Sequence, residues 1–397
     1  MTKNKVLITT LEPVSGGVPS MLKIIIEYLH QRNYQITLAY YSPYSMNPEL
    51  SVPVLKLFQR RPSIKKDFFH GCDGVGVGCW LPELEFTHNW LTERWQNLID
   101  QHTFHLTVSG SCLASYPYVQ TKTPFWAWIA TDWQGDREDR VKKFPLVRRF
   151  VDTTLIKPVA KRMEKKIIAS GNVIALSSYT KSQLNKRCFD GAVNDILAMP
   201  IDTESFKPQS KNEKKYRIAF VGRFSDPRKN LNLLLESVAQ VVEKIPLLEV
   251  YLIGDNLTLK QQEYSNELGI IEHLKIYDYM QRDALSKTLT TCDVFVLPSY
   301  QEGLCIAAME AMSCGVPIVS TRCGGPEMFI ENNVNGVLVD FNVTEMSAAI
   351  LQLLTNDELR LGYSFQARKT IVEQYNKETQ ERTFWALFDQ YAKTALL

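Results

Sequence analysis

The stretch that decides the fold is TCDVFVLPSYQEGLCIAAMEAMSCGVPIVST, residues 291–321. It predicts a buried strand over 293–299, a helix over 303–314 and a second strand over 317–321. Gly315 stands where a helix C-terminus favours glycine, so the end of the helix is well defined. Two short strands joined by one helix form a parallel pair with a right-handed crossover.

The same alternation of strands and helices continues through the second half of the chain. Further strands are predicted at 216–222, 248–255, 274–280 and 335–340, and further helices at 230–244, 257–268 and 283–290. Strands that alternate with helices of about 10–15 residues form a parallel sheet covered on both faces. The second half therefore predicts a doubly wound α/β domain.

The first half repeats this pattern with weaker signals. Strands are predicted at 5–10, 35–41, 106–110, 125–131 and 173–178, and a helix at 20–31. The stretch 43–104 has few strong signals, so we expect loops and insertions there. The first half therefore predicts a second domain with a parallel sheet.

Two domains agree with the length of 397 residues, because a domain typically has about 100–200 residues. The polar run KPQSKNEKK, residues 207–215, predicts a hinge. We expect Rossmann-like domains at 1–205 and 206–375, with the helix at 376–397 as a candidate part of the first. The two domains would face each other across a cleft that holds the ligand.

Composition and charge exclude several classes of protein. Hydrophobic residues make up 45% of the chain and charged residues 22%, which is typical of an ordinary globular protein. The formal net charge of +2 gives no electrostatic reason to expect a nucleic acid as a partner. No run of about 18 apolar residues predicts a membrane span, and Glu12 interrupts the first apolar run too early for a signal peptide. We therefore expect a cytoplasmic protein.

The residue types that hold metals and cofactors lack their usual spacing. The eight cysteines contain no CxxC pair, and the six histidines form no HExxH. We find no D-x-D pair, no GxxxxGK[ST] phosphate loop and no GxSxG nucleophile elbow. The dinucleotide-binding motif has a partial match in GVGVG, residues 74–78, which follows no predicted strand and opens no predicted helix. We expect neither a metal ion nor a cofactor.

Two glutamates in EGLCIAAME, Glu302 and Glu310, are candidates for the chemistry. If both were helical, a rise of about 1.5 Å per residue would place them about 12 Å apart along the axis. A glycosidase pair needs about 5–9.5 Å, so these carboxylates do not flank one bond. We expect Glu302 at the mouth of the site, just before the helix, and Glu310 deeper. The alternative is that both are exposed on an amphipathic helix.

The start of the same helix can bind oxygen atoms of a phosphate or a sugar. The first N–H groups of a helix have no partner within it, and here they belong to Leu304, Cys305 and Ile306. Gly303 lets the backbone approach a ligand closely.

A second candidate is VGRFSDPRKN, residues 221–230. The strand ends at Gly222, and three cations follow it, Arg223, Arg228 and Lys229. Cations at the carboxyl end of a strand can bracket a diphosphate and stabilise the charge on a departing nucleoside diphosphate. The alternative is a solvated basic loop that caps the next helix.

A third candidate is SGGVPS, residues 15–20, in the first domain. Gly16 and Gly17, followed by Pro19 at a helix start, predict an anion-binding loop. A simple tight turn is an equal alternative.

Together these segments resemble the retaining glycosyltransferases of family 4, which have the two-domain GT-B fold. The matching pieces are SGG near the start, SSYTKSQL (177–184), PIDTESFKP (200–208), GRFSDPRKN (222–230), residues 291–321 and the GG-x-E run from Gly324. They touch most of the chain, and the E-x7-E element from Glu302 to Glu310 is specific within this context.

The resemblance implies transfer of a sugar from a UDP- or GDP-linked donor to an acceptor hydroxyl, with retention of anomeric configuration and without a metal ion. Arg223 and Lys229 would bind the diphosphate and stabilise its departure. Glu302 would lie against the donor sugar, and Glu310 on the ribose hydroxyls. The other donor-binding positions would be Gly16 and Gly17 over the phosphates, Gly222, the backbone of Gly303, Leu304, Cys305 and Ile306, and Met280 near the base.

Two positions depart from the family pattern. Cys305 stands where many members have glycine, which keeps the main-chain contacts but alters the shape of the pocket. Thr131 and Asp132 stand where many members have a His-Asp pair, and Asp132 is the candidate for catalysis on the acceptor side.

A basic segment of the first domain is a candidate for the acceptor side. Residues Arg137–Lys166 contain eleven Lys or Arg and four Asp or Glu, with apolar side chains between them. Such a segment can bind the anionic inner face of a membrane or the phosphates of a lipid-linked acceptor. The alternative is a solvated helix face whose apolar side packs on the domain. We expect a lipid-linked or polysaccharide acceptor in cell-envelope glycan synthesis.

Two other functions stay open at this point. One is a non-catalytic nucleotide-sugar-binding protein, which the departures at Cys305 and Thr131 allow. The other is a nicotinamide-dependent oxidoreductase on paired Rossmann-like domains. The oxidoreductase would lack a proper G-x-G-x-x-G unit and would explain neither Glu310 nor Lys229.

Overall fold

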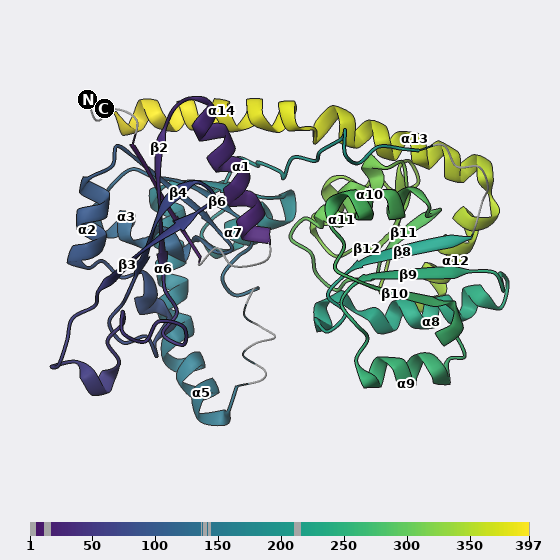
Figure 1. Ribbon diagram of the computed structural model, residues 1–397, viewed down its shortest axis with the longest axis horizontal. Helices are drawn as coiled ribbons and strands as arrows, with labels where there is room; N and C mark the ends of the chain where they lie inside the picture. Colours follow the sequence, from purple (N-terminus) through teal and green to yellow (C-terminus); the bar gives the residue numbers. More distant parts are fainter. Residues whose placement is uncertain are drawn as a thin grey trace. The chain divides into compact units, whose positions relative to one another are not determined.

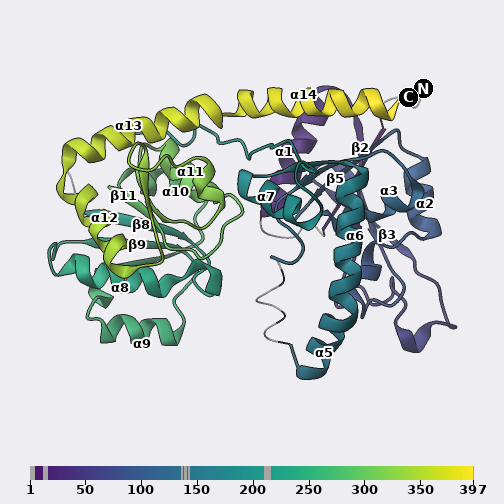
Figure 2. The ribbon, with the colours of Figure 1, turned by 180° about the vertical axis from the view of Figure 1, so that it is seen from behind.

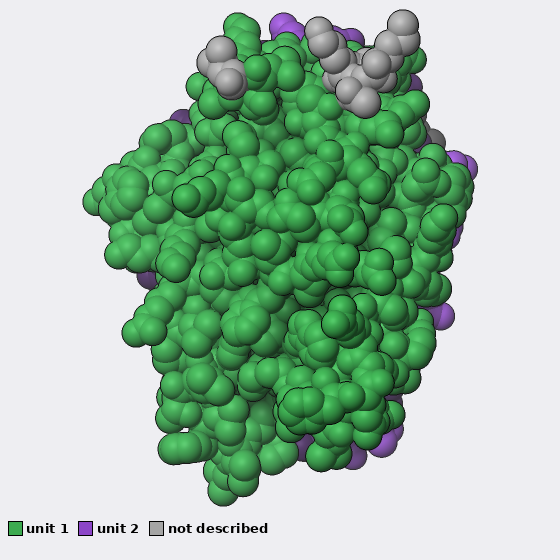
Figure 3. Space-filling view, turned by 90° about the vertical axis from the view of Figure 1, so that its left-hand side faces the viewer, with its two compact units in different colours: residues 1–197, 383–397 green, residues 198–382 purple. Residues whose placement is uncertain are grey.

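The computed structural model describes residues 5–11, 17–135, 137, 141, 144–209 and 216–396. The chain forms two compact units: unit 1 comprises residues 1–197 and 383–397, and unit 2 comprises residues 198–382 (Figure 3). Each unit contains one sheet with helices around it (Figure 1). The predicted fold class, with two Rossmann-like α/β domains, is confirmed. Of the hinge expected at 207–215, residues 210–215 lie outside the described residues.

Unit 1 is built on a seven-stranded sheet with the order β3-β4-β2-β1-β5-β6-β7. Its neighbouring strands are parallel, except that β3 and β4 are antiparallel. The strands are β1 (Lys5–Thr10), β2 (Gln35–Tyr41), β3 (Ile64–Phe69), β4 (Cys72–Val77), β5 (Phe104–Ser109), β6 (Trp126–Ile129) and β7 (Asn172–Ala175).

The helical elements of unit 1 connect these strands. They are α1 (Gly17–Gln31), η1 (Val54–Lys56), η2 (Glu85–Asn89), α2 (Glu93–Asp100), η3 (Cys112–Ser115), α3 (Tyr116–Thr121), α5 (Leu146–Val151), the π-helical η4 (Asp152–Ile156), α6 (Lys157–Ser170) and α7 (Ser178–Arg187). A long last helix, α14 (Lys377–Ala395), begins in unit 2 and continues into unit 1. Within the described residues, no helix has both the length and the apolar composition of a membrane span.

The expectation of loops over 43–104 was wrong for the hairpin of β3 and β4 and for α2. Strand β3 is mostly exposed, so it lacks the apolar alternation of a half-buried strand. Strand β4 contains Gly74 and Gly76, which weaken the strand signal. At Gly76 a β-carbon would lie 3.2 Å from Oη of Tyr40, so the close packing favours glycine. The GVGVG stretch therefore belongs mostly to a sheet strand and not to a phosphate loop.

Unit 2 is built on a six-stranded parallel sheet with the order β10-β9-β8-β11-β12-β13. The strands are β8 (Arg217–Gly222), β9 (Glu249–Gly254), β10 (Leu274–Asp278), β11 (Val294–Leu297), β12 (Ile318–Thr321) and β13 (Gly336–Val339). The helical elements are η5 (Pro227–Lys229), α8 (Leu231–Val242), α9 (Leu259–Glu267), η6 (Ile271–His273), α10 (Arg282–Thr290), α11 (Ile306–Ser313), η7 (Gly325–Met328), α12 (Val343–Thr355) and α13 (Asp357–Gln374). Figure 1 shows α8 on one side of this sheet and α10 and α11 on the other.

The strand order of unit 2 reverses between β8 and β11. From β8 the chain moves outward to β9 and β10, and it then returns to β11 on the other side of β8. Doubly wound sheets bind their ligands at the carboxyl ends of the strands beside such a reversal. The loops at this position are 223–230 after β8 and 298–305 after β11.

Candidate active site

The loop after β8 is folded by its own acidic residue. Asp226 Oδ1 accepts a hydrogen bond from the backbone N–H of Arg228 (3.0 Å) and so caps the turn η5. Asn230 then adopts a left-handed backbone with φ of 47°, and its Nδ2 donates to the carbonyl oxygen of Pro298 (3.1 Å). This bond ties the loop after β8 to the loop after β11.

A partly buried ion pair joins the two loops at their centre. Nζ of Lys229 donates to Oε1 of Glu302 at 2.7 Å, and the two side chains are 19% and 11% exposed. Ser299 Oγ donates to the same oxygen at 2.6 Å. Burial alone would lower the pKa of Lys229, but the Glu302 carboxylate and further neighbours raise it above its usual value. Lys229 is therefore a cation held in one place.

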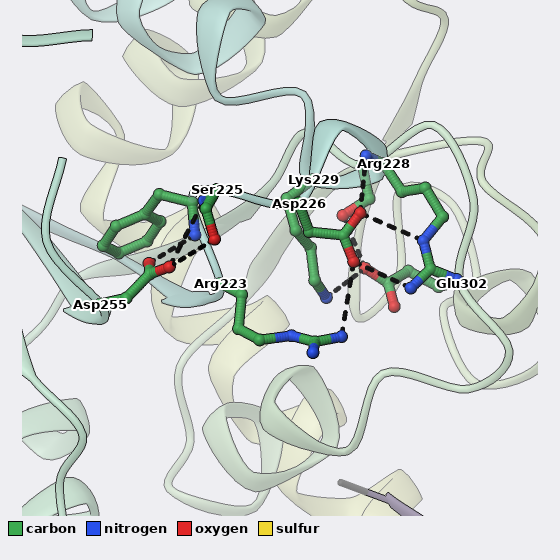
Figure 4. A network of polar contacts seen from close by, with 9 residues as sticks. Arg223, Ser225, Asp226, Arg228, Lys229, Asp255 and Glu302 are labelled. Carbon is green, nitrogen blue, oxygen red and sulfur yellow. Dashed lines mark hydrogen bonds and ion pairs between the residues drawn. The ribbon is translucent and has the colours of Figure 1, made fainter. Parts of the chain in front are cut away.

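Two further cations, Arg223 and Arg228, lie near this pair. Figure 4 shows them with the carboxylates of Asp226 and Glu302. Nη2 of Arg228 lies 2.8 Å from Oδ2 of Asp226, and Nη2 of Arg223 lies 3.5 Å from it. The Arg223 side chain is 73% exposed, so its guanidinium is open to a ligand. With Lys229, three cations lie among the carboxylates of Asp226 and Glu302, while a third carboxylate, Asp255, bonds to Ser225 of the same loop. The site therefore favours an anionic ligand through its exposed Arg223 guanidinium and not through a net positive charge.

A second loop, residues 323–325, holds the backbone of Glu302. The N–H of Glu302 donates to the carbonyl oxygen of Cys323 (2.8 Å), and the N–H of Gly325 donates to the carbonyl oxygen of Glu302 (2.9 Å). A β-carbon at Gly325 would lie 2.4 Å from the carbonyl oxygen of Gly303. The position of Glu302 thus depends on a close backbone contact that glycine allows.

The helix predicted from residue 303 begins three residues later than expected. Helix α11 begins at Ile306, and Cys305 before it has a left-handed backbone with φ of 67°. Burial raises the pKa of the Cys305 thiol, which is therefore neutral. No described residue accepts a hydrogen bond from the N–H groups of Leu304, Cys305 and Ile306. These N–H groups can bind a phosphate or sugar oxygen.

Glu310 lies within α11, apart from the ion pair. Burial raises the pKa of Glu310 to about 7, and the positive charge of Arg282 opposes this rise. Among the described residues, no side chain or backbone group forms a hydrogen bond or ion pair with its carboxylate. The carboxylate can therefore accept hydrogen bonds from a ligand.

Two other predicted positions lie at strand ends of unit 2. Gly222 ends β8, and a β-carbon there would lie 3.4 Å from Cε of Lys229, so the glycine leaves room for the lysine stem. Met280 follows β10, and its sulfur accepts a hydrogen bond from Oγ1 of Thr288 at 3.5 Å.

The remaining predicted positions belong to unit 1. Gly17 begins α1, and Gly16 lies outside the described residues. Asp132 is only 2% exposed, and its Oδ2 accepts hydrogen bonds from Nη2 (2.7 Å) and Nε (3.1 Å) of Arg187. In this structure Asp132 forms a buried ion pair within unit 1.

Sequence reasoning missed the residues that orient the cations and the loop: Asp226, Ser299 and Asp255. Asp255 follows β9, and its Oδ2 accepts a hydrogen bond from Oγ of Ser225 at 2.9 Å (Figure 4). A signal was available, because each is a polar residue at, or close after, the carboxyl end of a predicted strand. Within the described residues, no cluster of three or more His, Cys, Asp or Glu side chains is placed to hold a metal ion.

Comparison with known proteins gives a family match for part of the chain. The family model described as glycosyl transferases group 1 matches residues 201–370. This segment is similar to group 1 glycosyl transferases. The segment contains Arg223, Lys229, Glu302 and Glu310, but the match does not extend to Asp132.

Two curated relatives cover less than half of the chain. An uncharacterized glycosyltransferase of Methanocaldococcus jannaschii is 28% identical over 193 residues, which are 48% of this chain and 52% of that protein. The lipopolysaccharide core biosynthesis glycosyltransferase LpsE of Rhizobium meliloti is 30% identical over 160 residues, which are 40% of this chain and 45% of that protein. The chain thus spans about half the length of the curated relatives it matches.

A solved structure extends the likeness over both units. The structure of HepE from Anabaena, in complex with UDP, has a TM-score of 0.70 and 14% sequence identity, and it covers 97% of this chain and 100% of that chain. At this identity the likeness shows the fold alone, and that fold is GT-B. The segment that matches group 1 glycosyl transferases therefore lies in the second of two Rossmann-like domains with the GT-B fold.

Proposed function

We propose that this protein transfers a sugar from a nucleoside-diphosphate sugar to an acceptor hydroxyl with retention of configuration. The observation that carries the proposal is the group of Arg223, Arg228 and Lys229 around two carboxylates, beside the reversal of strand order in the segment that matches group 1 glycosyl transferases. A diphosphate fits this group, because guanidinium and ammonium donors bind phosphate oxygens and offset their charge.

In the proposed reaction, the acceptor oxygen attacks the anomeric carbon from the face on which the diphosphate leaves. The bond from the anomeric carbon to the acceptor oxygen forms as the bond to the diphosphate oxygen breaks, and the diphosphate takes the acceptor's proton. Arg223 and Lys229 stabilise the negative charge that grows on the diphosphate. Glu302 already holds Lys229 before the donor arrives, so little reorganisation accompanies the reaction.

The other site residues bind the donor in this proposal. Oε1 of Glu302 is used by Lys229 and Ser299, which leaves Oε2 for a hydroxyl of the donor sugar. Glu310 accepts hydrogen bonds from the ribose hydroxyls, and Met280 lies near the base. The N–H groups of Leu304 to Ile306 bind phosphate or sugar oxygens. Side chains and N–H groups supply the positive field, and neither a metal ion nor a cofactor takes part.

We further propose that the donor is UDP- or GDP-linked and that the acceptor is a lipid-linked or polysaccharide acceptor of the cell envelope, reached at the inner face of the membrane. The complex of HepE with UDP supports a uridine nucleotide. The name of LpsE, a lipopolysaccharide core biosynthesis enzyme, supports a role in glycan synthesis.

The test is nucleotide release from a panel of UDP- and GDP-sugars, with the anomeric configuration of the product read by NMR. Arg223→Ala and Lys229→Ala should each lower release by about 10²-fold or more, the scale of a lost electrostatic donor. Lys260→Ala, an exposed lysine on α9 of the same unit, is the matched control and should release nucleotide at the wild-type rate. Unchanged nucleotide release in both site variants would refute the proposal that Arg223 and Lys229 bind the diphosphate. Donor binding without release on any acceptor would favour the non-catalytic alternative.

A further inference from the structure

Unit 1 carries two tips whose large apolar side chains are exposed. The first tip, residues 54–58, presents Leu55 (89% exposed) and Phe58 (fully exposed, at 103%). The second tip, residues 146–155, presents Val147 (78%) and Phe150 (69%), with Leu146 and Leu155 beside them. These side chains contribute little to the packing of unit 1 itself. Exposed apolar groups gathered in this way mark interaction sites.

The two tips point to the same side of unit 1 although they are far apart in sequence. The turn that contains η1 and the helix α5 both project from the lower end of unit 1 in Figure 1. Figure 2, which shows the molecule from behind, places both at the lower end again. Both tips thus lie at the same end of unit 1, as contact with one flat partner requires.

Most exposed charges in the segments of both tips are positive, although the exposed carboxylate of Glu83 accepts a hydrogen bond from the backbone N–H of Val54 at 3.1 Å in the first tip. Residues 54–66 contain five Lys or Arg and no Asp or Glu. Residues 144–166 contain seven Lys or Arg, and their two acidic residues, Asp152 and Glu164, are buried. Apolar groups surrounded by cations are typical of protein segments that lie in the interface of a membrane with anionic lipid.

The second tip is held in place by a buried charge network, which corrects part of the expectation for Arg137–Lys166. Arg137 was counted among the surface cations, but it is 3% exposed. Its Nε lies 2.8 Å from Oε2 of Glu85, and its Nη1 lies 2.6 Å from Oδ1 of Asp152. Arg137 thus fastens η4 to η2 and cannot reach a lipid.

The alternative interpretation of the basic segment, a helix whose apolar side packs on the domain, describes α6. The inner side of α6 packs on unit 1 through residues that are buried: Ala160, Met163, Ile167 and Ile168. Helix α5 contains no buried residue, although its last residue, Val151, is partly buried against the core of unit 1. Of the cations predicted in this segment, those at 140, 142 and 143 lie outside the described residues.

We propose that the two tips insert together into the headgroup region of a membrane that contains anionic lipid, while the surrounding cations contact lipid phosphates. A membrane fits the two tips better than an acidic protein does. The exposed groups are aliphatic and aromatic side chains, which enter a lipid layer without specific contacts, and they lie on two separate projections. Insertion concerns unit 1 alone, and its test does not require sugar transfer. Failure of membrane binding and failure of the proposed reaction can therefore be told apart.

The test is co-flotation with vesicles of phosphatidylcholine that contain about one third phosphatidylglycerol, compared with phosphatidylcholine alone. We expect the wild type to float with the anionic vesicles at low salt. Leu55→Ser/Phe58→Ser and Val147→Ser/Phe150→Ser should each lower the partition coefficient at least about tenfold. Lys56→Gln/Arg61→Gln, which removes two exposed cations of the first segment, should lower it about tenfold or more.

The matched control is Leu361→Ser/Phe365→Ser, which removes two equally exposed apolar side chains from α13 of unit 2 (61% and 67%). This variant should bind vesicles as the wild type does. Phe58→Trp and Phe150→Trp each place a tryptophan on one tip. Brominated lipid should quench the fluorescence of each introduced tryptophan.

Three results would overturn the proposal. They are absence of wild-type binding to anionic vesicles, wild-type binding by both tip variants, and dimerisation of the wild type that the tip variants abolish. Because the substituted side chains are exposed, all variants should keep the wild-type circular dichroism spectrum.

Discussion

Replacing Gly325 by alanine places a methyl group against the backbone that carries Glu302. The new β-carbon would lie 2.4 Å from the carbonyl oxygen of Gly303 and 2.6 Å from Cα of Leu304. Both are backbone atoms, so one of the two loops must move. Overpacking at a buried position costs about 1–3 kcal/mol. The free energy of unfolding should fall by this amount, and UDP or GDP should bind more weakly because the N–H of Leu304 moves with the loop.

The matched control is the same substitution at Gly362, which is exposed within α13. No heavy atom lies within 4 Å of a β-carbon there. Alanine should stabilise this helix position by about 0.5–1 kcal/mol, so the two substitutions should act in opposite directions. All seven tryptophans belong to unit 1, so urea unfolding of unit 2 should be followed by far-UV circular dichroism. A Gly325→Ala protein as stable as the wild type would refute the view that this contact fixes Glu302.

Two further predictions concern buried acids of unit 1. Burial raises the pKa of Glu164 from 4.5 to about 7, so its protonated form stabilises the folded state. Stability should therefore fall as the pH rises from about 5 to about 8 in the wild type, and less so in Glu164→Gln, as urea unfolding at both pH values would show. Asp132→Asn removes the charge that pairs with Arg187 and should lower the free energy of unfolding by about 1–3 kcal/mol. A loss of sugar transfer without this loss of stability would instead support Asp132 as an acceptor-side residue.

The fold of unit 2 could be predicted because its central strands β11 and β12 are buried on both faces. All four residues of β11, Val294–Leu297, are buried, and such runs stand out in a sequence. The hairpin of β3 and β4 could not be predicted in this way. One of its strands is mostly exposed, and the other is rich in glycine. Its pairing brings Gly74 of β4 close to Asp67 of β3, where a β-carbon at Gly74 would lie 3.1 Å from the carbonyl carbon of Asp67.

The candidate cations could be predicted because the end of a strand fixes where a loop begins. Arg223 follows β8 directly, and Lys229 lies in the same loop. Their partners could not be predicted, because the Lys229–Glu302 pair joins residues 73 positions apart. The first apolar tip was also missed, although Leu55 and Phe58 stand in a stretch rich in Lys and Arg and without acids. Apolar residues can contact a partner only where they are exposed, and a sequence does not show which ones are exposed.

The carboxylates of the site have an electrostatic consequence for the proposed transfer. Asp226 and Glu302 reduce the positive potential that a diphosphate would meet, yet they also hold Arg228 and Lys229 in fixed positions. A fixed donor stabilises a growing charge better than a mobile one, because it need not reorganise during the reaction. Glu302→Gln should separate the two effects, since it keeps the shape of the side chain but removes its charge. If the carboxylate acts mainly by holding Lys229 in place, the variant should bind UDP at least as tightly as the wild type and yet release nucleotide more slowly. Faster nucleotide release would show instead that the carboxylate acts mainly by lowering the positive potential at the diphosphate.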